Sequence, residues 1–217
     1  MKDNWETIVH DRRVLYGMGG IVLGVLIVGG GYWFHRHRTE QYNQDAQVAF
    51  SYHLERMDLL STNTSAQAGD WTALEESFGV EYSRYKDSSL GPYFRAFQSE
   101  AALRAGDREQ AIALLAEAVR AMGSAAPLYY LYMVKLGVMQ LDSHNEQHHE
   151  SGMHDLLQLA QDTCNPYQGL AWYHLWHYAW VKGDSALIQR AYAKLQSFTD
   201  WYHMVQAKGA QITDTYE

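Results

Sequence analysis

The longest uninterrupted apolar segment of the chain spans residues 14–34. It reads VLYGMGGIVLGVLIVGGGYWF and contains no charged, Asn, Gln or Pro side chain. As an α-helix it would reach about 31 Å, the thickness of the hydrocarbon core of a bilayer. Arg12 and Arg13 precede it and Arg36 and Arg38 follow it, with aromatic residues near both ends. This pattern predicts an uncleaved transmembrane helix, because a signal peptide has a shorter apolar core and a small-residue cleavage site.

The predicted span divides the chain into an N-terminal tail, residues 1–13, and a long C-terminal part. Residues 35–66 read as a linking helix that also forms the first helix of that part, and residues 67–217 read as helical repeats. Lys and Arg are nearly balanced across the span. The slight excess before it favours a cytoplasmic tail and a C-terminal part outside the cytoplasm.

Four glycines inside the span fall on one side of a helix, at spacings of three, four and seven residues. They are Gly17, Gly20, Gly24 and Gly31. Small residues at this spacing let a second helix approach closely, which predicts a packing face for a partner membrane protein. The alternative is that glycine is simply common in membrane helices, and the sequence leaves both interpretations open.

Beyond the span, three short Gly-Asp segments separate apolar stretches with helical period. They are residues 68–70, 105–107 and 182–184. Glycine favours the left-handed conformation that ends a helix and aspartate caps the next one, so each segment predicts a helix–helix corner. Asp107 and Gln110 also have the spacing of a capping box. The corners recur about every 38 residues, or twice that. A fourth corner is therefore expected in the polar insert 142–152.

These corners predict helical hairpins followed by a last helix, 199–210, that covers the exposed apolar end. In the second hairpin, Ala111, Ile112, Leu115 and Ala118 form one apolar stripe at helical period. The predicted pairs are 39–66 with 71–86, 91–105 with 108–122, 126–141 with 151–163, and 167–182 with 185–197.

Charge and cysteine usage exclude several functions. The formal net charge is −8, and the whole excess of acidic residues follows residue 13. An acidic surface argues against binding nucleic acid, which needs basic residues. Cys164 is the sole cysteine, so no intramolecular disulfide can form. No phosphate-binding glycine loop or hydrolase motif occurs, so we expect neither a cofactor nor enzymatic activity.

Two groups of residues are candidates for chemistry or binding. The polar insert holds His144, His148, His149 and Glu150, ligand types that zinc accepts. They are expected in a loop without a rigid frame, so a metal-dependent enzyme is only a remote alternative.

The second group is aromatic and falls in two of the predicted first helices. It comprises Tyr129, Tyr132, Met133, Trp172, Tyr173 and Trp176. In helical solenoids the first helices line the binding surface, so these side chains are candidates for a protein-binding groove. The alternative is that most of the large rings fill the core between irregular repeats, leaving one or two for the groove.

Residues 105–119, AGDREQAIALLAEAV, resemble a tetratricopeptide repeat through Gly106, Ala111, Leu115 and Ala118. The plan of the whole chain is similar to the YfgM family, ancillary subunits of the bacterial SecYEG translocon. The resemblance implies an all-α protein with one N-terminal membrane helix, then a degenerate tetratricopeptide-like solenoid of about four hairpins and a C-terminal capping helix.

The same resemblance implies a single-pass protein of the bacterial inner membrane, with a periplasmic repeat domain. Its expected partners are translocon subunits, the membrane-anchored chaperone PpiD and exported polypeptides. The sequence therefore predicts a membrane-anchored, protein-binding repeat protein beside the translocon. A scaffold or assembly subunit of another envelope complex, for secretion, division or respiration, is the alternative.

Overall fold

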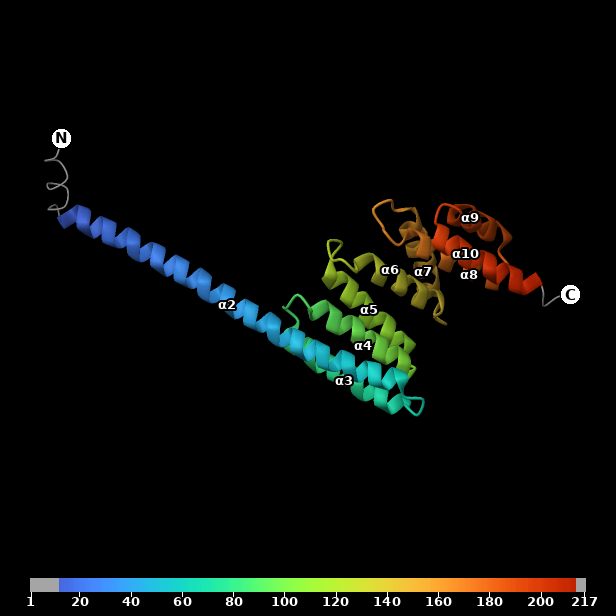
Figure 1. Cartoon of the computed structure of the whole chain (residues 1–217), viewed down its shortest axis with the longest axis horizontal. Coiled ribbons are helices and arrows are strands. Elements are labelled where there is room, and N and C mark those ends of the chain that lie inside the picture. The colour runs from blue at the N-terminus through green and yellow to red at the C-terminus, as the bar shows by residue number, and fades with distance from the viewer. Residues whose placement is uncertain (1–11, 214–217) are drawn as a thin grey trace, which may run out of the picture.

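The structure is a computed structural model, which describes the backbone of residues 12–213 and the side chains of residues 36–206. Within the described backbone all regular structure is helical, which confirms the predicted all-α class (Figure 1). The helices are α2 (Arg12–Thr62), α3 (Ala68–Tyr85), α4 (Gly91–Ala105), α5 (Arg108–Met122), α6 (Tyr129–Leu141), α7 (Glu146–Gln161), α8 (Gln168–Lys182), α9 (Ser185–Leu195) and α10 (Thr199–Thr213).

Helix α2 is continuous over 51 residues and packs against α3. The predicted linking helix therefore continues the helix that contains the predicted span, as Figure 1 shows. The side chains of residues 14–34, including Gly17, Gly20, Gly24 and Gly31, lie outside the described residues. Among residues 36–206, no helix combines the length and the apolar character needed to cross a bilayer.

Each helix packs against the next one along the chain, so the helices from α2 to α10 form a stack (Figure 1). The even-numbered helices also contact one another on one side of this stack. The ring of Phe50 in α2 lies 5.1 Å from that of Phe94 in α4. Tyr93 of α4 lies 6.3 Å from Tyr132 of α6, between ring centroids. Helix α6 in turn contacts α8.

The core consists of three clusters along the stack, and its composition changes from one end to the other. Between α2 and α4 it is built from phenylalanines such as Phe78 and Phe94, both fully buried. Around α5 it is built from small residues and leucine, and Ala111 and Ala118 are fully buried, as their predicted place in the stripe requires. Between α6 and α10 it contains Trp172 and other large side chains.

Two of the three predicted Gly-Asp corners are confirmed. Gly106 and Gly183 have φ of 99° and 72°, and each ends a helix in the left-handed conformation. Asp107 Oδ1 accepts a hydrogen bond from the backbone N–H of Gln110 at 3.0 Å, and Asp184 caps α9 in the same way. The reciprocal half of the capping box does not form, because the Gln110 side chain instead donates to Glu75 at 2.8 Å.

The corner predicted at residues 68–70 is wrong. Helix α3 already begins at Ala68, so Gly69 lies inside its first turn and the connection is residues 63–67. Asp70 caps the helix from its third position, where its Oδ2 accepts from the backbone N–H of Gln67 at 2.9 Å. A carboxylate stabilises the start of a helix either as the capping residue or from within the first turn. The Gly-Asp pattern alone does not distinguish these two positions.

The prediction that the polar insert 142–152 forms a loop is also wrong for most of its length. Helix α7 begins at Glu146, after Asn145 accepts a hydrogen bond from the backbone N–H of Gln147 at 3.0 Å. Gly152 is buried against α6, and a Cβ at this position would lie 2.6 Å from the carbonyl oxygen of Gly137. The helix therefore begins early because the insert contains both a cap and a close-packing residue.

Candidate functional site

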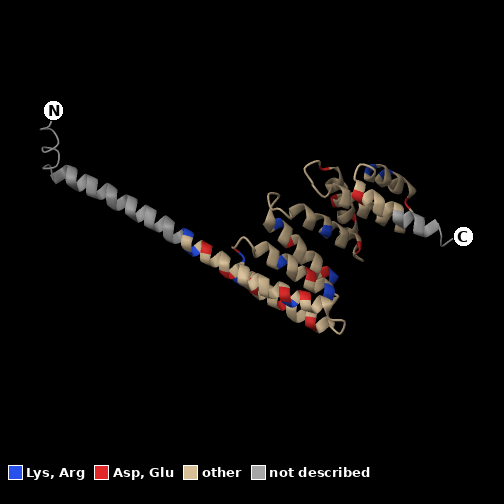
Figure 2. Cartoon of the chain, in the orientation of Figure 1, with Lys and Arg blue, Asp and Glu red and all other residues tan. Residues whose placement is uncertain are grey.

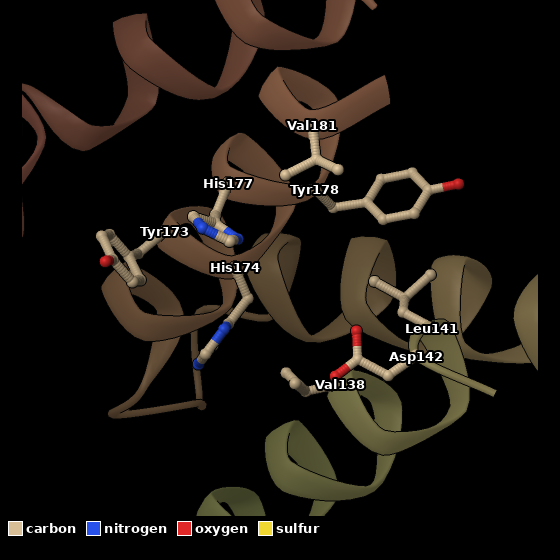
Figure 3. Close-up of a pocket in the computed structure, with 8 residues that line it drawn as sticks. All are labelled: Val138, Leu141, Asp142, Tyr173, His174, His177, Tyr178 and Val181. Carbon is tan, nitrogen blue, oxygen red and sulfur yellow. The ribbon is translucent and has the colours of Figure 1, made fainter. Parts of the chain in front are cut away.

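A pocket opens between α6 and α8 (Figure 3). Its volume is about 360 Å³. Helix α6 and the residue that ends it contribute Val138, Leu141 and Asp142. Helix α8 contributes Tyr173, His174, His177, Tyr178 and Val181.

The residues of α8 that line the pocket recur at helical spacing, so one stripe of the helix faces the opening. Its other side carries Trp172, Trp176 and Ala179, which are buried. Helices α6 and α8 each contain one Lys or Arg and no Asp or Glu. Figure 2 accordingly shows few charged residues on these two helices, whereas α2 to α5 carry many. The pocket is therefore an aromatic surface with few fixed charges.

Polar groups at the rim hold Tyr178 in place. Its hydroxyl is hydrogen-bonded to Nε2 of His149 in α7 at 2.8 Å. The ammonium group of Lys182 lies 5.9 Å from the centre of its ring. Burial, and then the negative charge of Asp184, raise the pKa of Tyr178, so its hydroxyl stays protonated near neutral pH. His177 is exposed and extends polar atoms beside the apolar lining.

Of the six predicted groove residues, only Tyr173 lines the pocket. Its ring packs 5.5 Å from that of Trp201 in α10. The prediction is wrong for Trp172 and Trp176, which are only 2% and 5% exposed and belong to the core. Their side of α8 is covered by neighbouring helices, so both tryptophans are among the rings that fill the core.

The three predicted groove residues in α6, Tyr129, Tyr132 and Met133, are half-buried and lie outside the pocket. Tyr132 faces α4, where burial, followed by the proximity of Tyr93 and Glu100, raises its pKa to about 12. Met133 packs against the core on both sides of α6. These side chains therefore contribute mainly to the packing of α6 against its neighbouring helices.

Sequence reasoning missed most of the lining, namely Val138, Leu141, Asp142, His174, His177, Tyr178 and Val181. The signal was present in α8, where Tyr173, His177 and Val181 are spaced four residues apart. The contribution of α6 has no such signal, because its pocket residues are ordinary core types at the end of a helix.

The histidine insert does not converge on a single point. Nδ1 of His148 lies 3.0 Å from Glu109 in α5, whereas His149 bonds to Tyr178 in α8. His144 and Glu150 are exposed. Among residues 36–206, no three His, Cys, Asp or Glu side chains are grouped so that they could hold a metal ion.

Fold and pocket together define an all-helical stack with an aromatic, weakly charged pocket on one side. No family model, curated protein or solved structure matches the chain. The protein is therefore classified by its own geometry, as an all-helical stack with an aromatic pocket.

Proposed function

We propose that this protein is a non-catalytic, membrane-anchored adaptor that binds polypeptide through the pocket between α6 and α8. The proposal assigns it to the bacterial inner membrane, with the N-terminal tail in the cytoplasm and the helical stack in the periplasm. There it works beside the protein-export translocon, with translocon subunits, a membrane-anchored chaperone and exported chains as partners. It requires neither a cofactor nor a metal.

The single observation that carries the proposal is the placement of the pocket on two helices that otherwise carry few charges. Tyr173, Val138, Leu141 and Val181 offer apolar surface, and His177 and Tyr178 offer hydrogen-bonding groups at its rim. A cavity of about 360 Å³ accommodates one or two apolar side chains of a segment that lies across it. Aromatic residues combine large contact area with little loss of side-chain entropy, which suits weak binding of varied polypeptides.

Two features of the sequence support the remaining parts of the proposal. The apolar segment 14–34 supplies an anchor, and α2 continues without a break from that segment into the stack. Tethering raises the effective concentration of the pocket near the membrane, so weak contacts suffice there. The Gly-Asp corners and the stripe through Ala111, Leu115 and Ala118 support a tetratricopeptide-like solenoid.

Site-specific photocrosslinking in native membranes tests this proposal. A photoreactive residue at His177 is expected to capture translocon subunits, a membrane-anchored chaperone or exported chains. The same residue at Gln189, exposed on α9, is the matched control and is expected to capture them far less. Adducts at His177 that lack all of these proteins, or equal adducts at both positions, would contradict the proposal.

A further inference from the structure

A second open cavity lies between α2 and α3 and involves neither α6 nor α8. Its volume is about 600 Å³. On α2 it is bordered by Asp45, Val48, Tyr52 and His53, and on α3 by Glu81 and Arg84. We refer to it as the α2–α3 groove. Val48 and Tyr52 are 73% and 62% exposed, so large apolar surface faces solvent at this end of the stack.

Two buried polar atoms of the groove have no hydrogen-bond partner within the described residues: Nδ1 of His53 and Oε2 of Glu81. The His53 side chain is only 7% exposed. A buried acceptor without a hydrogen bond is destabilising, so an occupant that supplies a donor to the groove gains affinity. Burial lowers the pKa of His53 more than Glu81 raises it, and Arg56 lowers it further, so the imidazole is neutral near pH 7.

These two atoms define the chemistry of the missing donor. The Glu81 carboxylate can only accept hydrogen bonds, and a neutral imidazole can present Nδ1 as an acceptor. Arg84 does not supply the donor, since neither atom has a partner and the Arg84 guanidinium instead lies 5.3 Å from the centre of the Tyr85 ring. A Lys or Arg side chain from outside the protein, with several N–H donors and a positive charge, has the chemistry that both acceptors lack.

The exposed apolar residues of α2 indicate a helical occupant. Val48, Tyr52 and Leu59 are exposed and recur at spacings of four and seven residues, as in the seam of a coiled coil. Val48 and Tyr52 also lie four heptads after Gly20 and Gly24. On a straight helix, positions seven residues apart rotate around the axis by about 20° per heptad. A left-handed supercoil removes this rotation and keeps such positions on one face. A helix wrapped around α2 would therefore follow the same face toward the predicted span.

Charge disfavours a second copy of this chain as the occupant. Asp45 and Glu55 share the heptad positions of Tyr52 and Val48. Two parallel copies joined through this face would place each carboxylate against its own counterpart, and like charges at close range are destabilising. A different helix with basic residues at those positions avoids this repulsion.

We propose that the α2–α3 groove binds an amphipathic helix of another protein, which packs apolar residues on Val48 and Tyr52 and inserts a Lys or Arg side chain between Glu81 and His53. This surface is separate from the pocket between α6 and α8. It would give the protein one stable partner in addition to the transient clients of that pocket.

Designed peptides test the proposal on the full chain purified in detergent. Two fluorescent helical peptides of about 21 residues carry Leu at the a and d positions and differ only in a central Lys or Glu. By fluorescence anisotropy we expect the Lys peptide to bind about tenfold more tightly, the size of effect that a charge-assisted hydrogen bond produces. Glu81→Gln should remove most of this difference, and Val48→Asp should abolish binding of both peptides.

Glu76→Gln is the matched control, because Glu76 is exposed on the same helix outside the groove. It should leave the tenfold preference intact, and circular dichroism should be unchanged in all variants. Equal binding of the two peptides, or no binding, would overturn the proposal. So would a dimer of the full chain, detected by sedimentation, that Tyr52→Asp dissociates. Since the peptides are soluble, the result is independent of the crosslinks at His177.

Discussion

The contact between α3 and α4 and the contact between α6 and α7 join neighbouring helices by opposite means. Between α3 and α4, Gln98 Nε2 donates to Glu75 Oε1 at 3.1 Å, and both side chains are nearly buried. Between α6 and α7, Gly152 lies against the backbone of α6, and Gly137 leaves room for the Leu156 side chain.

The difference shows how each contact responds to substitution. A polar pair spans the space between helices, so apolar side chains of similar size can replace it when both partners change. A glycine contact leaves no space, so any added atom must move a backbone. The predictions below test this contrast, from the largest expected effect to the smallest.

Gly152→Val should have the largest effect. The new Cβ would lie 2.6 Å from the carbonyl oxygen of Gly137 and 2.9 Å from the backbone nitrogen of Leu141. We expect the free energy of unfolding to fall by about 3 kcal/mol, the upper part of the usual range for overpacking. Urea unfolding followed by circular dichroism measures it.

Gly69→Ala is the control for that variant. No atom lies within 4 Å of a Cβ built at Gly69, in the first turn of α3. Alanine is a better helix former, so this change should be neutral or stabilise by up to about 1 kcal/mol. If Gly152→Val were equally well tolerated, the close contact between α6 and α7 would be wrong.

Glu75→Ala should destabilise by about 2 kcal/mol, because it leaves the buried amide of Gln98 without its acceptor. The double variant Glu75→Met with Gln98→Met should recover most of that loss, since it removes both buried partners, and the exposed Gln110, which also donates to Glu75, can bond to water instead. A double-mutant cycle in urea, with Glu75→Met and Gln98→Met as the single variants, gives the coupling energy. Simple addition of the two single effects would contradict the contrast with the glycine contact.

Asp107→Ala and Asp184→Ala should each cost about 1 kcal/mol, because each carboxylate caps the N-terminus of a helix. The two sites lie in different parts of the stack, one before α5 and one before α9, so equal losses would show that both corners depend on the same local interaction. Asp107→Asn, which keeps a side-chain oxygen, is the control and should lose much less. Thermal unfolding monitored by circular dichroism is sufficient for the comparison.

The smallest effect is expected at the link between α4 and α6, where Lys135 and Arg104 pair with Glu100. Burial, the largest single influence, opposes ionisation of Glu100, but Lys135 and then Arg104 outweigh it and lower its pKa below the usual 4.5. A lowered carboxyl pKa adds stability above pH 4.5 that is lost as the pH falls through the folded-state value.

Lys135→Met should therefore reduce stability by about 0.5 kcal/mol at pH 7, and the difference should shrink as the pH falls below 4.5. Urea unfolding at several pH values measures it. Lys182→Met, whose ammonium group faces the Tyr178 ring, is the control and should show no such pH dependence. A loss for Lys135→Met that is constant over the whole pH range would contradict the assigned role of Glu100.

Much of the helical pattern could be predicted because local interactions determine it. The bounds of α4 and α5 match the prediction, since Gly106 and Asp107 provide both the end of one helix and the cap of the next. The start of α7 was missed by about five residues, because the polar composition of the insert predicted a loop. Asn145 and Gly152 stabilise the helix there, and the role of Gly152 depends on Gly137 in another helix.

The candidate site was predicted less well, because exposure depends on neighbours that are distant in sequence. Trp172 and Tyr173 are adjacent in the chain, yet one is buried in the core and the other lines the pocket. Their aromatic character is the same, so composition could not separate them. The unpaired buried atoms of His53 and Glu81 could not be predicted either, because their burial depends on the packing of α3 against α2.

By itself, the sequence determined the all-helical class, the positions of most corners and the alanine stripe of α5, because caps, left-handed glycines and a period of 3.6 residues act within a few positions of the chain. Only the tertiary structure decided which side of each helix is covered. It placed the pocket between α6 and α8, assigned the tryptophans to the core and left the groove between α2 and α3 open, because burial is a property of helices packed together.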